Sequence, residues 1–277
     1  MATKPVIAGT DGSQESLMAV EWAAREAVLH GTSLRIVAVP VLPPRMSPNP
    51  ATRDAVASMV EHSMKRALGA AAQRAQTIEP DLAIQTQMLD GAPAEALTEA
   101  GRDAMLVVLG SRGAGGFSAM ILGSVSRYVA THAPVPVVVA REETIAAHRE
   151  IVVGVRDPAQ SGAALRFAFE EAALRKARLL ALHAWSWSAP GRADAPEEEN
   201  GRLESAVTTW QEKFPEVEAR WELVHAHPGR VLSGLSARAD LVVLGRHGPG
   251  EQAPGVGSVT HAVLSHAHGP VVSVPGE

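Results

Sequence analysis

The chain has 277 residues, enough for two ordinary domains. Hydrophobic residues make up 46% of it and charged residues 20%, which predicts packed cores and excludes a largely disordered chain. The net charge of −5 argues against a nucleic-acid-binding protein. The absence of cysteine excludes a disulfide framework and thiol catalysis. No apolar run reaches the ~20 residues of a membrane span, and no signal peptide is evident, so we expect a soluble cytoplasmic protein.

The first half of the sequence alternates predicted strands with predicted helices. Short apolar runs predict the strands, and apolar residues recurring at helical spacing predict the helices. Ser13 is placed to cap the first helix, which carries Val20 and either Ala27 or Val28 on its apolar face. The second helix is expected to place Met59 on its apolar face. The predicted strands span residues 6–8, 34–39, 84–88, 105–109 and 135–139, and three of the helices span residues 51–76, 93–101 and 124–132.

This alternation predicts an α/β fold, in which helices cover both faces of a parallel sheet. In such a sheet, ligands bind beyond the carboxyl ends of the strands, at the point where the strand order reverses. Asp11, Val39 and Gly110 each lie at the carboxyl end of a predicted strand. We therefore expect these three residues to line one crevice.

The two halves of the sequence are copies of each other. The segment that begins at Val6 aligns without a gap with the segment that begins at Ile151, and VVLGSRG at 107–113 matches VVLGRHG at 242–248. Repeats of this length predict two copies of one domain. A charged segment between them is suited to a short linker. The predicted domains span residues 1–141 and 150–277.

A glycine-rich loop follows the apolar run at 105–109. It begins at Gly110 and leads to Gly123 and Ser124, where the next predicted helix starts. Glycines let a backbone approach an anion closely, and free N–H groups at a helix start point toward it. The segment 104–139 therefore predicts a phosphate-binding cradle. A turn with a helix cap and no ligand is the alternative interpretation.

The spacing of Gly110, Gly113, Gly123 and Ser124, with Asp11 after the first strand, resembles the ATP-binding branch of the universal stress protein family. The resemblance covers nearly the whole chain apart from the linker and the proline-rich loop. The second copy makes the chain similar to a tandem member. The family implies two Rossmann-like domains of the adenine nucleotide alpha hydrolase-like type, each with a five-stranded parallel sheet. It also implies ATP as ligand, with Mg²⁺ between Ser124 and the phosphates as an option.

The resemblance assigns roles to individual residues. Gly9, Thr10 and Asp11 match positions that meet the adenosine, and Val39 matches a backbone position that meets adenine. Arg112 either adds charge or points into water. The residues matched to the ribose and the phosphates are Gly110, Ser111, Arg112, Gly113, Ala114, Gly115, Gly116, Gly123, Ser124, Val125 and Ser126.

The second copy departs from this pattern. Arg156 stands where the first copy has Asp11, which reverses the charge beside the expected ribose, and the loop carries prolines, which lack N–H donors. We expect a weakened, altered or empty second site and one nucleotide per chain. A small backbone shift that lets Asp157 replace Asp11 is the alternative. The possible second site comprises Gly154, Asp157, Gly245, Gly248, Gly257, Ser258 and Val259.

No catalytic residue and no metal ligand is predicted. The sequence lacks a nucleophile elbow, serine-triad spacing and a Walker A lysine, so efficient ATP hydrolysis is not expected, although slow hydrolysis remains open. The pairs His225/His227 and His266/His268 could ligate a metal, but the repeat places both in ordinary structural positions. The acidic run 197–199 predicts a solvated mobile loop, with a docking site for a partner as the alternative.

The leading hypothesis is an ATP-binding regulatory protein that couples nucleotide sensing to a stress or dormancy response. A protein-interaction scaffold with little nucleotide binding is the alternative from another class, and a weak ATPase or phosphotransferase is the third. In the family, domains pair through their last strands, which here lie in the matching segments 134–139 and 269–274. The resemblance therefore implies pairing of the two copies, a homodimer and a protein partner that the sequence does not identify.

Overall fold

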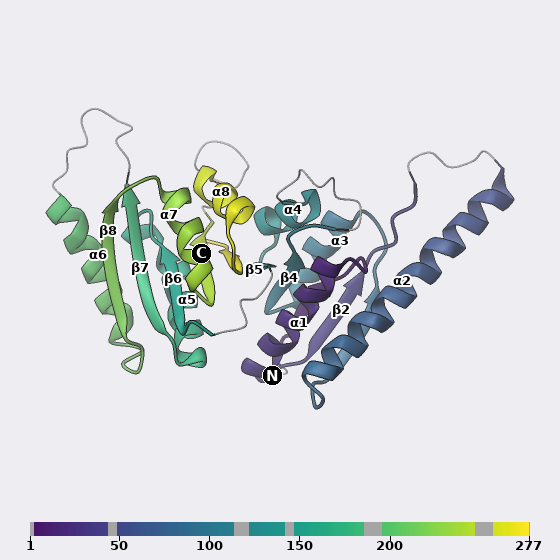
Figure 1. Cartoon of the computed structure of the whole chain (residues 1–277), viewed down its shortest axis with the longest axis horizontal. Helices are drawn as coiled ribbons and strands as arrows, with labels where there is room; N and C mark the ends of the chain where they lie inside the picture. The colour runs from purple at the N-terminus through teal and green to yellow at the C-terminus, as the bar shows by residue number, and fades with distance from the viewer. Residues whose placement is uncertain are drawn as a thin grey trace. The chain divides into compact units, whose positions relative to one another are not determined.

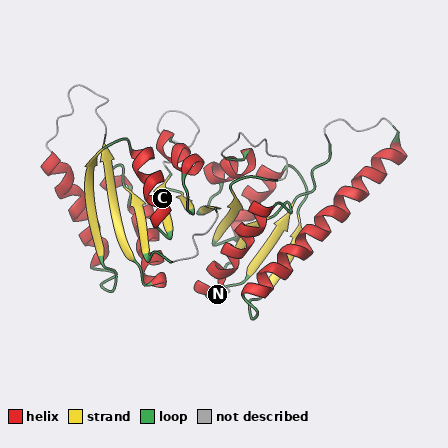
Figure 2. Cartoon of the chain, in the orientation of Figure 1, coloured by secondary structure: helices red, strands yellow, loops and turns green. Residues whose placement is uncertain are grey.

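The computed structural model describes residues 3–43, 49–113, 122–141, 147–185, 196–246 and 257–276. The chain divides into two compact units, Met1–Arg141 and Glu142–Glu277. Each unit alternates strands with helices, as Figures 1 and 2 show, so the predicted α/β class is confirmed. Among the described residues, no helix combines the length and the apolar character needed to cross a membrane.

The first unit is built on five parallel strands in the order β3-β2-β1-β4-β5. The strands are β1 (Val6–Gly9), β2 (Leu34–Ala38), β3 (Ile84–Met88), β4 (Leu106–Gly110) and β5 (Val137–Ala140). The helices are α1 (Gln14–Leu29), α2 (Pro50–Ile78), α3 (Pro93–Ala100) and α4 (Ser124–His132), with one 3₁₀ turn, η1 (Gly101–Asp103).

The second unit repeats this arrangement, with its strands in the order β10-β9-β6-β7-β8. The strands are β6 (Glu150–Gly154), β7 (Arg178–Trp185), β8 (Ala219–His225), β9 (Leu241–Gly245) and β10 (Val271–Val274). The helices are α5 (Gly162–Arg175), α6 (Pro196–Gln211), α7 (Pro228–Leu235) and α8 (Ser258–His266), with the 3₁₀ turns η2 (Pro158–Gln160) and η3 (Ser236–Arg238).

The strand register is the same in both units. Val6 lies beside Leu34 in the first sheet, and the matching residues Ile151 and Leu179 lie side by side in the second. All four side chains are fully buried. A one-residue slip would move every side chain of a strand to the other face of the sheet, so burial on both faces fixes this register.

Helix α1 begins where the sequence predicts. The Ser13 hydroxyl accepts a hydrogen bond from the Ser16 N–H at 3.3 Å and caps the helix. Val20 and Ala27 are buried against the sheet, whereas Val28 is 48% exposed, which decides between the two positions that the apolar spacing left open. The cap fixes the path of the chain between β1 and α1, and this path carries Asp11.

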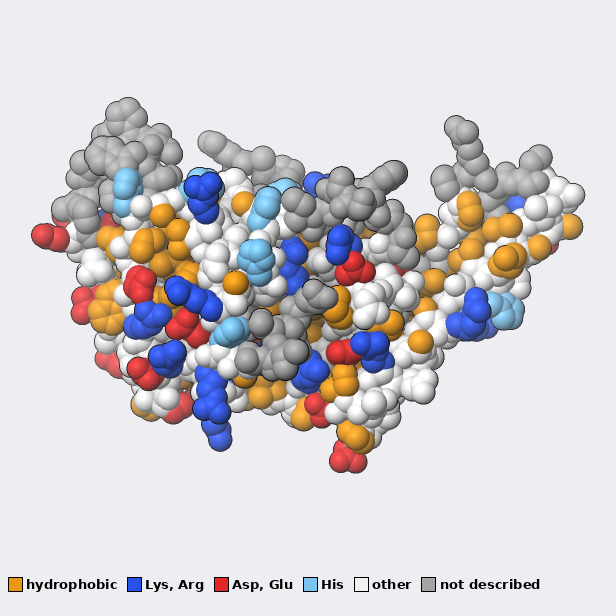
Figure 3. Space-filling model, in the orientation of Figure 1, with side chains coloured by type: hydrophobic (Ala, Val, Ile, Leu, Met, Phe, Trp, Pro, Cys, Tyr) orange, Lys and Arg blue, Asp and Glu red, His pale blue; other side chains and the backbone are white. Residues whose placement is uncertain are grey.

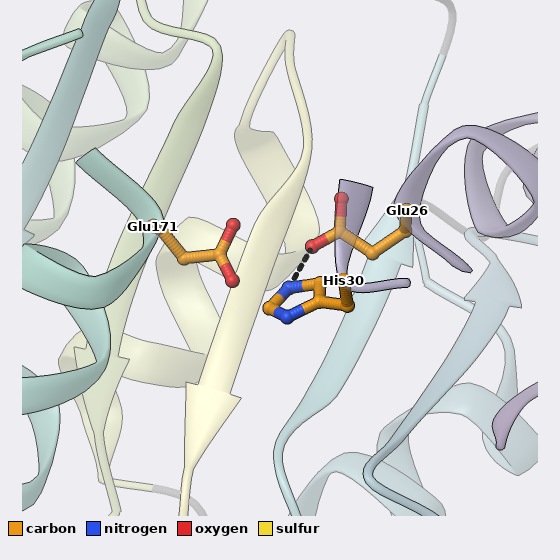
Figure 4. A group of neighbouring side chains, drawn as sticks. All are labelled: Glu26, His30 and Glu171. Atoms are coloured by element: carbon orange, nitrogen blue, oxygen red, sulfur yellow. Dashed lines mark hydrogen bonds and ion pairs between the residues drawn. The ribbon is translucent and has the colours of Figure 1, made fainter. Parts of the chain in front are cut away.

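Each unit buries one carboxylate on the helix that follows its first strand. In α1, the Glu26 carboxylate lies 3.3 Å from Nε2 of His30, the C-cap residue of this helix (Figure 4). At the matching positions of α5, Glu171 forms an ion pair with Arg175 at 3.0 Å. A buried carboxylate without a partner is strongly destabilising, so each copy keeps a basic side chain one turn away. The repeat thus extends to the charged residues of the core.

The prediction of a continuous apolar face along α2 is wrong for the first half of the helix. Leu68, Ala71 and Ala75 are buried against the sheet, but Met59 is 72% exposed. Figure 1 shows that the first half of this helix extends beyond the strands, and Figure 3 shows hydrophobic side chains exposed along it. Helical periodicity identified a face of the helix, but the length of the sheet decides how much of that face is covered.

The acidic run in the second unit was expected to lie in a loop, and this prediction is wrong. Glu197, Glu198 and Glu199 lie in the first turn of α6 rather than in a loop. Carboxylates near a helix N-terminus are stabilised by the unpaired N–H groups there. The run therefore has a local structural role as part of a helix start.

Candidate functional site

The first unit contains a pocket of about 320 Å³ at the carboxyl ends of β1, β2 and β4. Strand β1 lies between the other two strands, so this is the point where the strand order reverses. Asp11, Val39 and Gly110 all line this pocket, so the three strand ends share one crevice, as expected. The lining residues are Gly9, Thr10, Asp11, Ser16, Val37, Val39, Val41, Pro93, Leu97, Leu109, Gly110, Arg112, Gly113, Gly123, Ser124, Val125 and Ser126.

The structure brings together nearly all of the predicted site residues that it describes. The exception is Ser111, which is buried and does not line the pocket. Ala114, Gly115 and Gly116 lie outside the described residues. The ends of the glycine-rich loop are therefore placed at the pocket.

The turn after β1 holds the Asp11 carboxylate in place. Its Oδ1 atom accepts hydrogen bonds from the Ser13 N–H at 3.0 Å and from the Ser13 hydroxyl at 2.6 Å. Gly12 makes the turn with φ +82°, a conformation that favours glycine. A Cβ atom on Gly113 would lie 2.5 Å from Asp11 Oδ2. The loop can approach the carboxylate this closely because residue 113 has no side chain.

Two buried hydroxyls join the end of β1 to the start of α1. Thr10 Oγ1 and Ser16 Oγ lie 3.0 Å apart, and Ser16 Oγ donates to the Ser13 carbonyl at 2.9 Å. Ser16 lines the pocket but was not predicted as a site residue. Its position in the first turn of the helix, next to the Asp11 turn, is the sequence signal that could have identified it.

The loop after β4 is fixed at both of its ends. A Cβ atom on Gly110 would lie 2.8 Å from the Glu15 carbonyl, so glycine permits the close packing of β4 against α1. The Ser126 hydroxyl donates to the Gly110 carbonyl at 2.7 Å, and the Gly123 N–H donates to the Ser111 carbonyl at 2.8 Å. These bonds direct the start of α4 toward the pocket.

Helix α4 presents its first N–H groups to the pocket. Gly123 is the N-cap residue and makes no side-chain hydrogen bond to the helix. Ser124, Val125 and Ser126 line the pocket. The first N–H groups of a helix have no partner within the helix and carry partial positive charge, so this wall is suited to an anion.

Arg112 lines the pocket and forms an ion pair with Glu15 at 2.9 Å. The Arg112 side chain is 45% exposed. Exposed ion pairs contribute at most ~1 kcal/mol, so a phosphate group could displace Glu15 at small cost. The ion pair therefore holds the half-exposed guanidinium beside the start of α1, at the edge of the pocket.

Part of the pocket lining is apolar, and the sequence predicts only some of these residues. Val37 of β2 and Val39, which directly follows this strand, both line the pocket, as expected when side chains two residues apart in an extended chain share a face. Pro93 and Leu97 of α3 complete this wall with Leu109. The alternation along β2 could have identified Val37, but the contribution of α3 depends on packing between distant segments.

A smaller pocket, of about 140 Å³, lies at the matching place in the second unit. Of the predicted second-site residues, Asp157 is not part of its lining, and Gly248 lies outside the described residues. The Asp157 carboxylate instead accepts from the Ala159 N–H at 3.0 Å and caps η2. The lining residues are Gly154, Val155, Arg156, Leu182, Ala184, Pro228, Leu232, Leu244, Gly245, Gly257, Ser258, Val259 and Thr260.

Charge also differs outside the lining of the second pocket. Arg246 stands where the first unit has Ser111, directly after β9. Burial lowers the pKa of the Arg246 guanidinium to about 10, which still leaves it charged at neutral pH. The positive charge after β9 therefore lies one residue closer to the strand than Arg112 does after β4.

Comparison with known proteins agrees with the repeat and the fold. The model of the Universal stress protein family matches residues 2–141 and again 148–275. A universal stress protein of Mycobacterium tuberculosis is 33% identical over 96% of this chain and 93% of its own length, and one of Mycolicibacterium smegmatis is 33% identical over 97% and 96%. The crystal structure of a universal stress protein from Archaeoglobus fulgidus is similar over 99% of this chain and 97% of its own, with a TM-score of 0.72 and 18% identity. This chain therefore belongs to the universal stress protein family, with two family domains in tandem.

Proposed function

We propose that the chain binds one ATP molecule in the pocket of the first unit and acts as a nucleotide-dependent regulatory protein in a stress or dormancy response. The observation that carries the proposal is that one pocket combines an apolar wall, a carboxylate and the N-terminus of a helix. These three surfaces suit the adenine, the ribose and the phosphates of ATP.

Each part of the nucleotide has a matching surface. The apolar wall that includes Val39 and Leu97 suits the adenine ring. Asp11 presents a carboxylate that can accept hydrogen bonds from ribose hydroxyls. The start of α4 and Arg112 suit the phosphates.

The lining favours binding over catalysis. Asp11 and Arg112 are the only charged residues in the described lining of the pocket, and Asp11 is engaged with Ser13. Phosphoryl transfer needs a group that positions the nucleophile and several charges that stabilise the transition state. Mg²⁺ would be held mainly by the phosphates, and the Ser124 hydroxyl, which lines the pocket, could supply a protein oxygen.

The test measures ATP binding to the full chain by isothermal titration calorimetry, with mass spectrometry of any nucleotide released on denaturation. We expect one equivalent of ATP per chain. Asp11→Ala removes the ribose acceptor and should weaken ATP binding about tenfold or more, since hydrogen bonds to charged groups contribute ~1.5–3 kcal/mol.

Asp157→Ala is the matched control, because it removes the same charge from a residue that lies in the second unit and outside its pocket. It should leave ATP affinity unchanged. Unchanged ATP affinity in Asp11→Ala, or a wild-type chain that binds no nucleotide, would contradict the proposal.

A further inference from the structure

We propose that the pocket of the second unit is a binding site for a small phosphate-bearing anion without a nucleoside. The site is separate from the proposed ATP site and takes a ligand of a different chemical class. The inference rests on the charge, the hydrogen-bond donors and the size of this pocket.

The charge at the end of the first strand is reversed. Arg156 lines the second pocket at the position that Asp11 occupies in the first. A guanidinium has only N–H donors, so it cannot accept hydrogen bonds from ribose hydroxyls, but it matches the geometry of phosphate oxygens. Asp157 does not restore the acceptor, because its carboxylate is directed to the Ala159 N–H.

Helix α8 supplies donors from the other side of the pocket. Its N-cap residue Gly257 makes no side-chain hydrogen bond to the helix, and Ser258, Val259 and Thr260 line the pocket. The unpaired N–H groups of this helix start are therefore directed to the same space as Arg156.

Thr260 adds an independent observation. It is only 7% exposed and lines the pocket, and within the described part of the chain its hydroxyl forms no hydrogen bond. The matching Ser126 hydroxyl of the first unit donates to the Gly110 carbonyl at 2.7 Å. The Thr260 hydroxyl is therefore available as a donor within the pocket, and an anion there would supply its acceptor.

The size of the pocket argues against a nucleoside. Its volume is about 140 Å³, against about 320 Å³ in the first unit. Sites for ligands of nucleotide size are typically ~300 Å³ or larger. Leu182, Leu232 and Leu244 form an apolar part of the lining. An apolar wall excludes water and strengthens the attraction between Arg156 and an anion.

The test uses equilibrium dialysis of the full chain with radiolabelled inorganic pyrophosphate, in the presence of saturating ATP, which occupies the first pocket. We expect one equivalent of pyrophosphate per chain. Arg156→Gln should weaken this binding about tenfold or more, because it removes a charge-assisted contact. Arg166→Gln makes the same charge change on the exposed side of α5 and should have no effect.

Thr260→Val, which keeps the size of the side chain and removes the hydroxyl, is a second variant and should also weaken pyrophosphate binding. Pyrophosphate binding that is insensitive to Arg156→Gln, absence of pyrophosphate binding, or two equivalents of ATP per chain would overturn the inference. If the chain binds no ATP at all, the proposed function fails, and the same dialysis without ATP still tests whether pyrophosphate binding depends on Arg156.

Discussion

The two pockets of this protein have the same backbone framework and opposite charges at the ends of their first strands. Each lies where the first strand of its unit runs between two parallel neighbours, and the strand register is the same in both units. The first pocket has a carboxylate at the end of that strand, and the second has a guanidinium. The buried strands therefore determine where a ligand binds, while the first residues after the strands determine which ligand is suitable.

The largest expected difference between the units is the loss of stability when the last residue of β4, Gly110, or the matching last residue of β9, Gly245, is replaced by alanine. In Gly110→Ala, the new Cβ atom would lie 2.8 Å from the backbone of Glu15, so α1 has to move. We expect a loss of ~1–3 kcal/mol in the free energy of unfolding of the first unit, together with weaker ATP binding. In Gly245→Ala, the nearest atom is the Ala164 Cβ at 3.4 Å, and we expect a loss of ~0.5 kcal/mol or less.

Native-state hydrogen exchange in urea measures this comparison, because it reports the opening of each unit separately. Equal losses in Gly110→Ala and Gly245→Ala would show that the two strand ends are packed alike, contrary to the structure.

A smaller effect is expected for Gly113→Ala. The new methyl group would lie 2.5 Å from Asp11 Oδ2, at the end of a side chain that can turn away. The free energy of unfolding should change little, whereas ATP affinity should fall severalfold because the carboxylate leaves its position beside the loop. Calorimetric titration with ATP, paired with urea unfolding, checks this separation. A large loss of stability would instead assign Gly113 a role in the fold.

The smallest expected effect is a pH dependence of stability that only the second unit has from this position. His183 of β7 stands where the first unit has Ala38, and burial lowers the pKa of its imidazole despite nearby Glu199 and Asp157. The unfolded chain therefore binds the proton more readily than the folded unit, so stability falls as the pH drops below the ordinary pKa of 6.5. At pH values above the pKa of His183 in both the folded and the unfolded chain, neither state binds the proton and this loss of stability is absent.

His183→Ala, which introduces the residue of the first unit, should reduce this acid sensitivity of the second unit. Urea unfolding of the wild type and the variant, above and below pH 6.5, measures the difference between them. The same pH dependence in both proteins would show that other groups of the second unit bind the protons.

Local patterns in the sequence predict the framework of the fold and the polar end of the first site. The run 84–88 forms β3 and residues 124–132 form α4 with the predicted bounds. The last strand of the first unit begins at Val137, two residues later than predicted, because Pro136 has no N–H for pairing. Asp11 and Gly110 are identified because turns and glycines leave a local signal.

The remaining features depend on contacts between distant segments. Leu97 reaches the pocket from α3, and periodicity within α3 cannot show which strand end it will contact. The exposure of Met59 depends on where the sheet ends, and the different sizes of the two pockets depend on the packing of several elements together.

The second helix of each unit shows where this architecture tolerates insertions and deletions. Helix α2 has 29 residues and its counterpart α6 has 16, yet the strands on either side keep a common register in both units. The outer half of α2 lies beyond the strands, so its turns can be added or removed without changing any strand pairing. Most of the length difference between the two copies of this domain thus lies at the rim of the sheet, whereas the glycine-rich loop at the pocket differs by a single residue, with 12 residues between Gly110 and Gly123 and 11 between Gly245 and Gly257.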